Sequence, residues 1–262
     1  ESQFTRLRRL RRWLIGVPLL AVAAIVLVWS VPVIVANTSL RQSIVSVALS
    51  DFEGSVTIGS ASLGWLSPLL ARDIEARDGR GQPLGHVKSL RSEKSLLGLL
   101  SDTSHPGVIL VEEPKLHLVL RPDGSNWEDA LAKLLSEPSQ GSAVQKLTIQ
   151  VEGGTLEVRD AASRGPWRFD ELQFAMQWDE AAPLPIKVRA AGVLGSDGKQ
   201  SGPVSVDWAW KPGDNDETYF GDGQLTLRGQ SVPLAAFSSL AQRFVGDIQA
   251  QGTANCDALG AL

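Results

Sequence analysis

One segment near the N-terminus constrains the whole chain, because it is long, apolar and free of charge. It runs from Leu14 to Val35, 22 residues without a charged side chain. At ~1.5 Å per residue, a helix of this length crosses a hydrocarbon core ~30 Å thick. We therefore predict a transmembrane helix over residues 13–36, so that everything behind it folds while tethered to a bilayer.

The charges around this segment predict its orientation. Only Arg41 lies close behind it, whereas five arginines and an interfacial tryptophan precede or begin it: Arg6, Arg8, Arg9, Arg11, Arg12 and Trp13. Positive charge favours the cytoplasmic side of a membrane. A cleaved secretory signal fits less well, because the apolar run is long and continues through Pro32 into polar Asn37. We predict residues 1–12 to be cytoplasmic and the body of the chain to be extracytoplasmic.

The body is predicted to be mainly β with a few short helices. Leu40, Ile44 and Val47 recur at helical spacing, which indicates a short amphipathic helix directly behind the span. Farther on, glycine-bounded segments alternate apolar and polar residues, the period of half-buried strands. We predict strands at 55–65, 70–78, 84–92, 108–113, 115–121, 144–153, 154–161, 167–178, 185–195, 202–212, 222–229 and 247–255, and helices at 94–102, 126–137 and 233–244. Short turns favour an elongated, curved antiparallel sheet.

A polar, turn-forming segment, EPSQGSA at 137–143, predicts a boundary between two β modules. The first would cover residues 37–140 and the second residues 141–262. Both show strands interrupted by a helix, which suggests one sheet extended module by module. The last residues, GTANCDALGAL, stop where another strand would begin, so we expect the second module to continue beyond residue 262.

Composition narrows the possible function. The net charge is −4 and no basic cluster lies outside the N-terminal flank, so nucleic acid is not an expected partner. The single cysteine, Cys256, excludes an intrachain disulfide. With 43% hydrophobic residues, the body is able to bury or present a large apolar surface.

The sequence contains no pattern typical of a catalytic or metal site. His86, His105 and His117 are far apart and lack the spacing of metal ligands. Neither a nucleophile elbow nor a phosphate-binding glycine loop is present. Glu112 and Glu113 are adjacent in a predicted strand, where successive side chains point to opposite faces. We therefore predict no enzyme activity and no cofactor.

Alternating apolar residues form the candidate binding face. They are Leu116, Leu118, Leu120, Leu147, Ile149, Val151, Phe174, Met176, Val204, Val206 and Trp208. Two interpretations remain open, namely a face packed against a second layer, as in a β-sandwich, and an open groove for an apolar ligand. The predicted helices are too few to cover a dozen strands, which favours the groove.

The N-terminal half resembles the AsmA-like family, which is related to chorein-type, bridge-like lipid transfer proteins. The resemblance rests on the arginine-flanked span with its following helix, on residues 56–84 with their Ile-Gly, Gly-Trp and Asp-Gly pairs, and on RPDGSNWEDAL at 121–131. It covers residues 10–135 well. Beyond them it rests on the general pattern of strands.

The resemblance implies a curved sheet whose apolar inner face carries phospholipid acyl chains between membranes. It implies a bacterial inner-membrane location with the body in the periplasm, and the bilayer, phospholipids and other envelope proteins as partners. A dozen strands at ~4.8 Å would give a groove of about 50–60 Å, too short to cross an envelope alone. The alternative is an envelope scaffold whose sheet edges pair with β-rich outer-membrane clients.

Overall fold

A single curved sheet dominates the computed structural model, which describes residues 26–121, 123–136, 144–160, 166–196, 199–211, 222–233 and 253–261. The mainly β fold with a few short helices is thus confirmed for these residues. The cytoplasmic segment 1–12, the boundary segment 137–143 and the predicted helix at 233–244 lie outside them.

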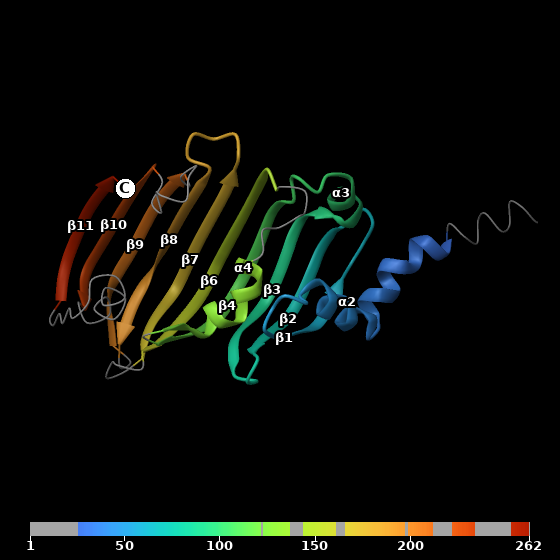
Figure 1. Cartoon of the computed structure of the whole chain (residues 1–262), viewed down its shortest axis with the longest axis horizontal. Coiled ribbons are helices and arrows are strands. Elements are labelled where there is room, and N and C mark those ends of the chain that lie inside the picture. The colour runs from blue at the N-terminus through green and yellow to red at the C-terminus, as the bar shows by residue number, and fades with distance from the viewer. Residues whose placement is uncertain are drawn as a thin grey trace, which may run out of the picture.

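Ten strands follow one another across the sheet in the order of the chain (Figure 1). They are β1 (Gly54–Ser62), β2 (Pro68–Asp78), β3 (Pro83–Ser95), β4 (Gly107–Arg121), β6 (Lys146–Asp160), β7 (Trp167–Asp179), β8 (Ile186–Ser196), β9 (Lys199–Lys211), β10 (Asp222–Pro233) and β11 (Thr253–Ala261). The two-residue strand β5 (Gly124–Ser125) pairs with the end of β4. The helices are α2 (Leu40–Ala48), α3 (Leu96–Ser101) and α4 (Asn126–Ser136). Residues 26–37 are also helical.

Neighbouring strands are antiparallel at every step but one. β4 and β6 are parallel and pair from Gly107–Leu147 to Leu120–Asp160. A parallel pair needs a crossover connection, and β5 and α4 belong to it. The sheet therefore runs without interruption through the predicted module boundary, and the expectation of a purely antiparallel meander was wrong at this pair.

Six strands share an irregularity at the same level of the sheet, which we call the crease. In each, two consecutive non-apolar residues stand where alternation would place one: Gly59-Ser60, Arg72-Asp73, Lys88-Ser89, Glu112-Glu113, Glu152-Gly153 and Asp170-Glu171. The register aligns the first five, since Ser60 pairs with Arg72, Arg72 with Ser89, Ser89 with Glu112 and Glu112 with Glu152. The step in β7 lies about one pair farther along.

The backbone turns left-handed at the crease. Glycine 153 has φ of 65°, and Asp73, Glu113 and Glu171 have φ of 52°, 47° and 54°. These three are the only non-glycine residues with positive φ in the described part of the chain. Such a conformation costs a residue with a side chain ~1–2 kcal/mol, so its repetition in neighbouring strands marks a shared bend.

The crease explains why four predicted strands merge into two. The predicted break at Pro114 lies inside β4, and the predicted turn at Gly153-Gly154 lies inside β6. Proline lacks a backbone donor, but the pairing of β4 with β6 is interrupted between Glu112 and Lys115. Proline, which would interrupt a regular strand, is therefore tolerated at position 114.

Each pair at the crease adds one residue to the alternating pattern, and this extra residue keeps the apolar side chains on both sides of the crease on one face of the sheet. The regular strand β8 places Ala190 and Leu194 on the same side, and their partners in β7 are Phe174 and Phe169. Phe174 and Phe169 are five residues apart, so the alternation in β7 slips by one position at the crease. Glu112 and Glu113 both lie between Val111 and Pro114, which pair with the apolar Leu90 and Val87, so the expectation of strict alternation was wrong at this pair.

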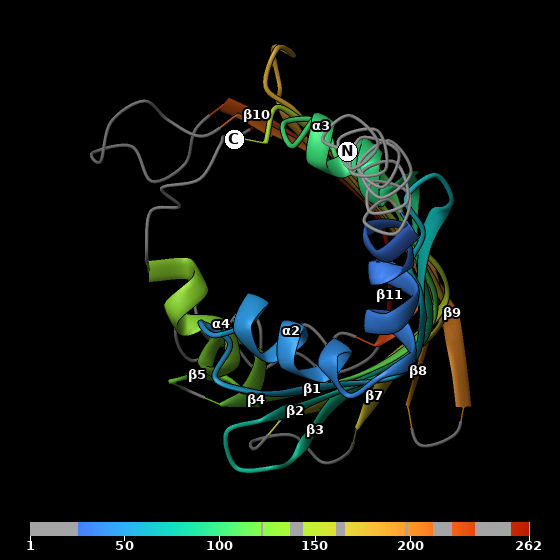
Figure 2. The ribbon, with the colours of Figure 1, turned by 90° about the vertical axis from the view of Figure 1, so that its right-hand side faces the viewer.

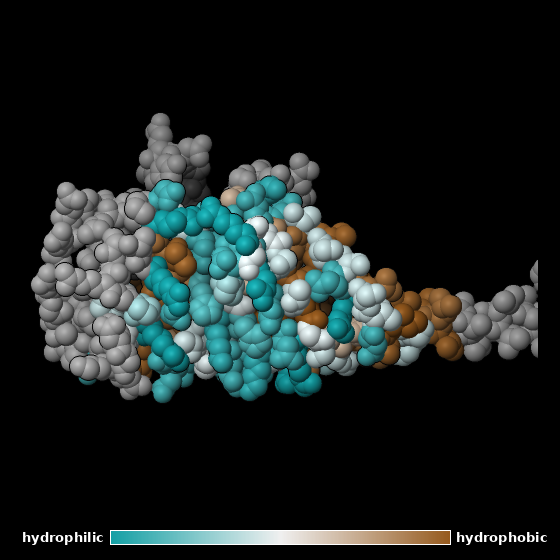
Figure 3. Space-filling view, turned by 90° about the horizontal axis from the view of Figure 1, so that it is seen from below, coloured by the Kyte–Doolittle hydropathy of each residue, from teal (hydrophilic) through white to brown (hydrophobic). Residues whose placement is uncertain are grey.

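Bulge-like irregularities bend strands, and the sheet is bent into an arch. Figure 2, which looks along the sheet from its β1 end, shows the strands curving around an inner side. Figure 1 looks onto that concave side, where α4 lies in front of the strands. Seen from below in Figure 3, the outer surface is mainly hydrophilic. The apolar face therefore lines the concave side.

Helix α4 is fastened to β4 through one buried amide. The backbone N–H of Val119 donates to Oδ1 of Asn126 at 2.9 Å, and Nδ2 of Asn126 donates to the carbonyl of His117 at 2.9 Å. The indole of Trp127 donates to the same carbonyl at 3.1 Å. The Asn126 side chain thus takes the place of β3 along the end of β4, beyond the last pair of these two strands at Gly85 and Leu116.

We expect Asn126→Ala to destabilise the protein by about 1–3 kcal/mol, because it leaves a buried N–H without its partner. The free energy of unfolding in denaturant measures this loss, and hydrogen exchange at the Val119 amide locates it. Asn126→Asp keeps the acceptor and should lose less. Unchanged exchange at Val119 in Asn126→Ala would contradict the role assigned to this amide.

The predicted transmembrane helix is only partly within the described residues. Residues 13–25 lie outside them, and residues 26–37 form a helix that leads to α2. None of the helices in the described ranges combines the length and hydropathy needed to cross a bilayer.

Candidate functional site

The apolar face is built from rows of paired residues that cross the sheet. We call the side of the crease toward Gly107 of β4 above and the side toward Arg121 below. Above the crease, one row contains Ile109, Ile149, Met176, Val188, Trp208 and Leu225. The next row contains Leu90, Val111, Val151, Phe174, Ala190, Val206 and Leu227. Below the crease a row contains Leu116, Leu156, Phe169 and Leu194. None of these rows contains a charged residue, so the face is continuous and apolar across many strands.

The structure brings all eleven predicted residues to this face. Leu116, Leu118 and Leu120 lie below the crease in β4, whereas Leu147, Ile149 and Val151 lie above it in β6. The others are Phe174 and Met176 in β7 and Val204, Val206 and Trp208 in β9. Their inclusion in one surface follows from the register.

Sequence analysis missed the contributions of β8 and β10. Ile186, Val188 and Leu194 project from β8, and Leu225 and Leu227 from β10. The alternation that marks them is visible in the segments predicted as strands at 185–195 and 222–229. Grouping every alternating strand by face would have found them.

Most side chains of the apolar face are only half-buried. Leu120, Leu194 and Val204 are buried, but Ile149, Met176 and their row partners retain partial exposure. A β-sandwich would bury such residues against a second sheet. The described residues form a single sheet, so the sandwich interpretation was wrong for them, and none of them builds a second sheet over the apolar face.

One tight cluster on this face extends from the row of Val206 and Leu227 to the row of Phe169 and Leu194. Leu194 and Val204 are buried together, and Trp167, Phe169 and Leu227 pack against them. The indole nitrogen of Trp167 is buried without a hydrogen-bond partner. The face is therefore closely packed around Leu194 and Val204 and more open in the row of Ile149 and Met176.

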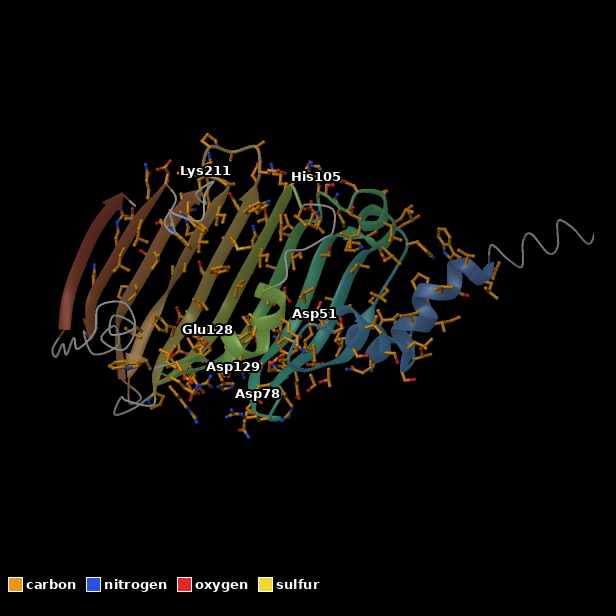
Figure 4. All side chains as sticks on the ribbon, in the orientation of Figure 1. Asp51, Asp78, His105, Glu128, Asp129 and Lys211 are labelled. Carbon is orange, nitrogen blue, oxygen red and sulfur yellow. The ribbon has the colours of Figure 1, made fainter. Side chains whose placement is uncertain are left out.

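Charged groups lie outside the apolar face. Arg189 and Asp207 form an ion pair at 2.7 Å on the opposite side of β8 and β9, in a shallow hollow that Gln177, Gln224 and Thr226 also line. Figure 4 shows labelled charges at strand ends and on α4, among them Asp78 and Lys211. No cluster of three potential metal ligands occurs among the described residues.

The groups whose pKa values are shifted also lie outside the apolar face. At the crease, a hydrogen bond from Lys88 to Glu113 raises the lysine pKa. At the end of β7, the hydrogen bond from Lys146 lowers the pKa of Asp179. Hydrogen bonds from His105 and Lys94 lower the pKa of Asp102, behind α3, to about 2. These shifts belong to exposed ion pairs at rims and on the outer surface, which fits an apolar ligand on the inner face better than a reactive one.

Together these features define a class of protein: a single curved sheet with a polar outer surface and an uncovered apolar inner face. No protein-family model and no curated protein matches the chain.

Proposed function

We propose that the concave face is a groove that binds phospholipid acyl chains. The observation that carries this proposal is the set of uncharged rows across the sheet, which remain half-exposed and face no second sheet among the described residues. Acyl chains gain ~0.8 kcal/mol for each CH₂ removed from water and need no directional hydrogen bonds. A long apolar surface of this kind therefore suits flexible hydrocarbon better than a rigid polar ligand.

The dimensions support hydrocarbon chains as the ligand. At ~4.8 Å between strands, ten strands span about 45 Å. One leaflet of a bilayer core is about 15 Å thick, so the face is several acyl chains long. Several lipids would thus lie along one protein, or one lipid would slide from row to row.

The N-terminal sequence supports a membrane location for this activity. We propose that residues 13–36 anchor the chain in a bacterial inner membrane, with the body in the periplasm. The protein would then take part in phospholipid transport between membranes or in envelope homeostasis, as the resemblance to the AsmA-like family implies. It binds lipid without converting it, and other envelope proteins would complete the path.

A vesicle assay tests transfer directly. The full chain is reconstituted into donor vesicles with a fluorescent phospholipid, and the arrival of that lipid in acceptor vesicles is followed over time. We expect transfer several-fold above protein-free vesicles. Transfer equal to the protein-free rate, combined with capture of unfolded outer-membrane β-proteins, would favour the scaffold alternative.

A further inference from the structure

Exposed apolar side chains concentrate at the β1 end of the molecule. Among large apolar residues of the described chain, those that are exposed all lie in residues 26–49 or at Leu66, Leu97 and Leu100, apart from Val144. Elsewhere in the sheet, the rows of large apolar side chains lie on the half-buried inner face. This end therefore presents hydrocarbon outward, where a water-facing surface would carry polar groups.

Three elements that are separate in the sequence carry these side chains. They are α2, the β1–β2 loop at residues 63–67, and α3, and they add to the exposed apolar residues of the N-terminal helix at residues 26–37 and to Leu49 directly behind α2. The loop and α3 are joined by backbone hydrogen bonds, from the N–H of Leu96 to the carbonyl of Gly64 at 3.2 Å and from the N–H of Leu97 to that of Trp65 at 3.1 Å. The indole of Trp65 donates to the carbonyl of Val28 at 3.2 Å. The loop is thus tied both to α3 and to the N-terminal helix.

The elements surround the end of the sheet. In Figure 2, which faces this end, α2 and α3 lie on opposite rims of the arch, with the N-terminal helix beside them. Gln42 of α2 bonds the carbonyl of Val56 in β1, which holds that helix against the edge strand. We call α2, residues 63–67 and α3 the collar.

The collar is also almost free of charge. Residues 62–68 and 95–101 contain no charged side chain, and residues 26–50 contain only Arg41, in a chain that is 21% charged. Arg41 donates to the carbonyl of Ala36 at 3.1 Å. On α2, Leu40, Ile44 and Val47 are exposed by 50%, 52% and 76% and share one face. Such a helix is typical of one that lies in a membrane interface.

We propose that the collar inserts into the surface of the bilayer that holds the N-terminal segment and seats the end of the groove against its lipids. The helix at residues 26–37 leads back into the uncharged sequence of residues 14–25, which places that bilayer beside the collar. The inference rests on the proposed function, because it assigns the place where lipid enters. Acyl chains would pass from the leaflet to the β1 end of the groove, where Ala71 and Leu90 lie in the row that continues with Val111.

Fluorescence quenching tests this contact in the full chain. Cys256→Ser removes the native thiol, and Leu97→Cys or Val47→Cys then carries an environment-sensitive dye. Gln177→Cys, on the outer surface of β7, is the control. In phosphatidylcholine–phosphatidylglycerol vesicles we expect a nitroxide on the acyl chain to quench both collar dyes several-fold more than the control. Equal quenching at all three positions, or collar dyes that iodide reaches as readily as the control, would overturn the proposal.

A double variant tests the role of the collar independently of the role of the groove. Leu97→Asp combined with Leu100→Asp should slow uptake of lipid from vesicles several-fold and leave the free energy of unfolding nearly unchanged, because both side chains are exposed. Quenching at the collar without any lipid transfer would support the collar and contradict the proposed function. Normal uptake by the double variant would contradict the collar and leave the groove intact. Cross-linked dimers with unquenched dyes would assign the surface to a second copy of the chain.

Discussion

A single charge in the middle of the apolar face, Ile149→Asp, is expected to reduce lipid transfer by tenfold or more. Ile149 lies between Ile109 and Met176 in a row that crosses the sheet. An unpaired carboxylate against acyl chains costs several kcal/mol, and each 1.4 kcal/mol is a factor of ten in affinity. The vesicle transfer assay measures the effect.

The stability of the same variant distinguishes an open apolar face from a closed hydrophobic core. Because water reaches the half-buried face, Ile149→Asp should cost about 1 kcal/mol, close to the loss of strand propensity alone. Gln150→Asp is the matched control, since Gln150 is the next residue and points to the outer surface. It should keep wild-type transfer. Equal transfer by both variants, or complete unfolding of Ile149→Asp, would contradict an open lipid-binding face.

The second large effect is expected at the crease, where Gly153→Val should destabilise the fold by about 1–3 kcal/mol. Valine is poorly tolerated at the φ of 65° that Gly153 adopts. A Cβ at this position would be 3.6 Å from Cγ of Glu113, an ordinary contact, so the cost is conformational. If β6 straightens to accommodate valine, the arch opens and bound lipid decreases several-fold.

A glycine outside the sheet provides the control for this prediction. Gly81, in the turn between β2 and β3, has φ of 78° and no atom within 4 Å of an added Cβ. Gly81→Ala should therefore lower stability by about 1 kcal/mol and keep the wild-type amount of lipid per chain. Denaturant unfolding measures the free energy of unfolding, and lipid extraction with mass spectrometry measures the amount of lipid per chain. Wild-type lipid content in Gly153→Val would show that the crease does not shape the binding face.

The strands were predictable because alternation has a period of two. That period groups Leu116, Leu118 and Leu120 on one side of their strand and Leu147, Ile149 and Val151 on one side of theirs, and the register shows that both sets lie on the same face of the sheet. The amphipathic helix behind the predicted span also occurs, as α2.

The crease was not predictable from alternation, since it consists of interruptions of that pattern. Pro114 and Gly153 are typical of turns, and only the register shows that each lies at the same level as polar pairs in neighbouring strands. The parallel pairing of β4 with β6 also depends on where the crossover returns, which single-strand patterns do not encode. Of the collar, the helices α2 and α3 were predicted but their union with the loop at residues 63–67 was not, because the loop and α3 are joined through backbone hydrogen bonds between Trp65 and Leu97 and between Gly64 and Leu96.

Photocrosslinking at adjacent positions of β7 tests the central claim most directly. A photoreactive amino acid replaces Met176, on the apolar face, or Ala175, on the outer face, in the full chain within phospholipid membranes. After illumination, mass spectrometry detects phospholipid attached to the protein. We predict attachment at position 176 and little or none at position 175. Equal attachment at both positions, or attachment at 175 alone, would contradict the assignment of the concave face as the lipid-binding site.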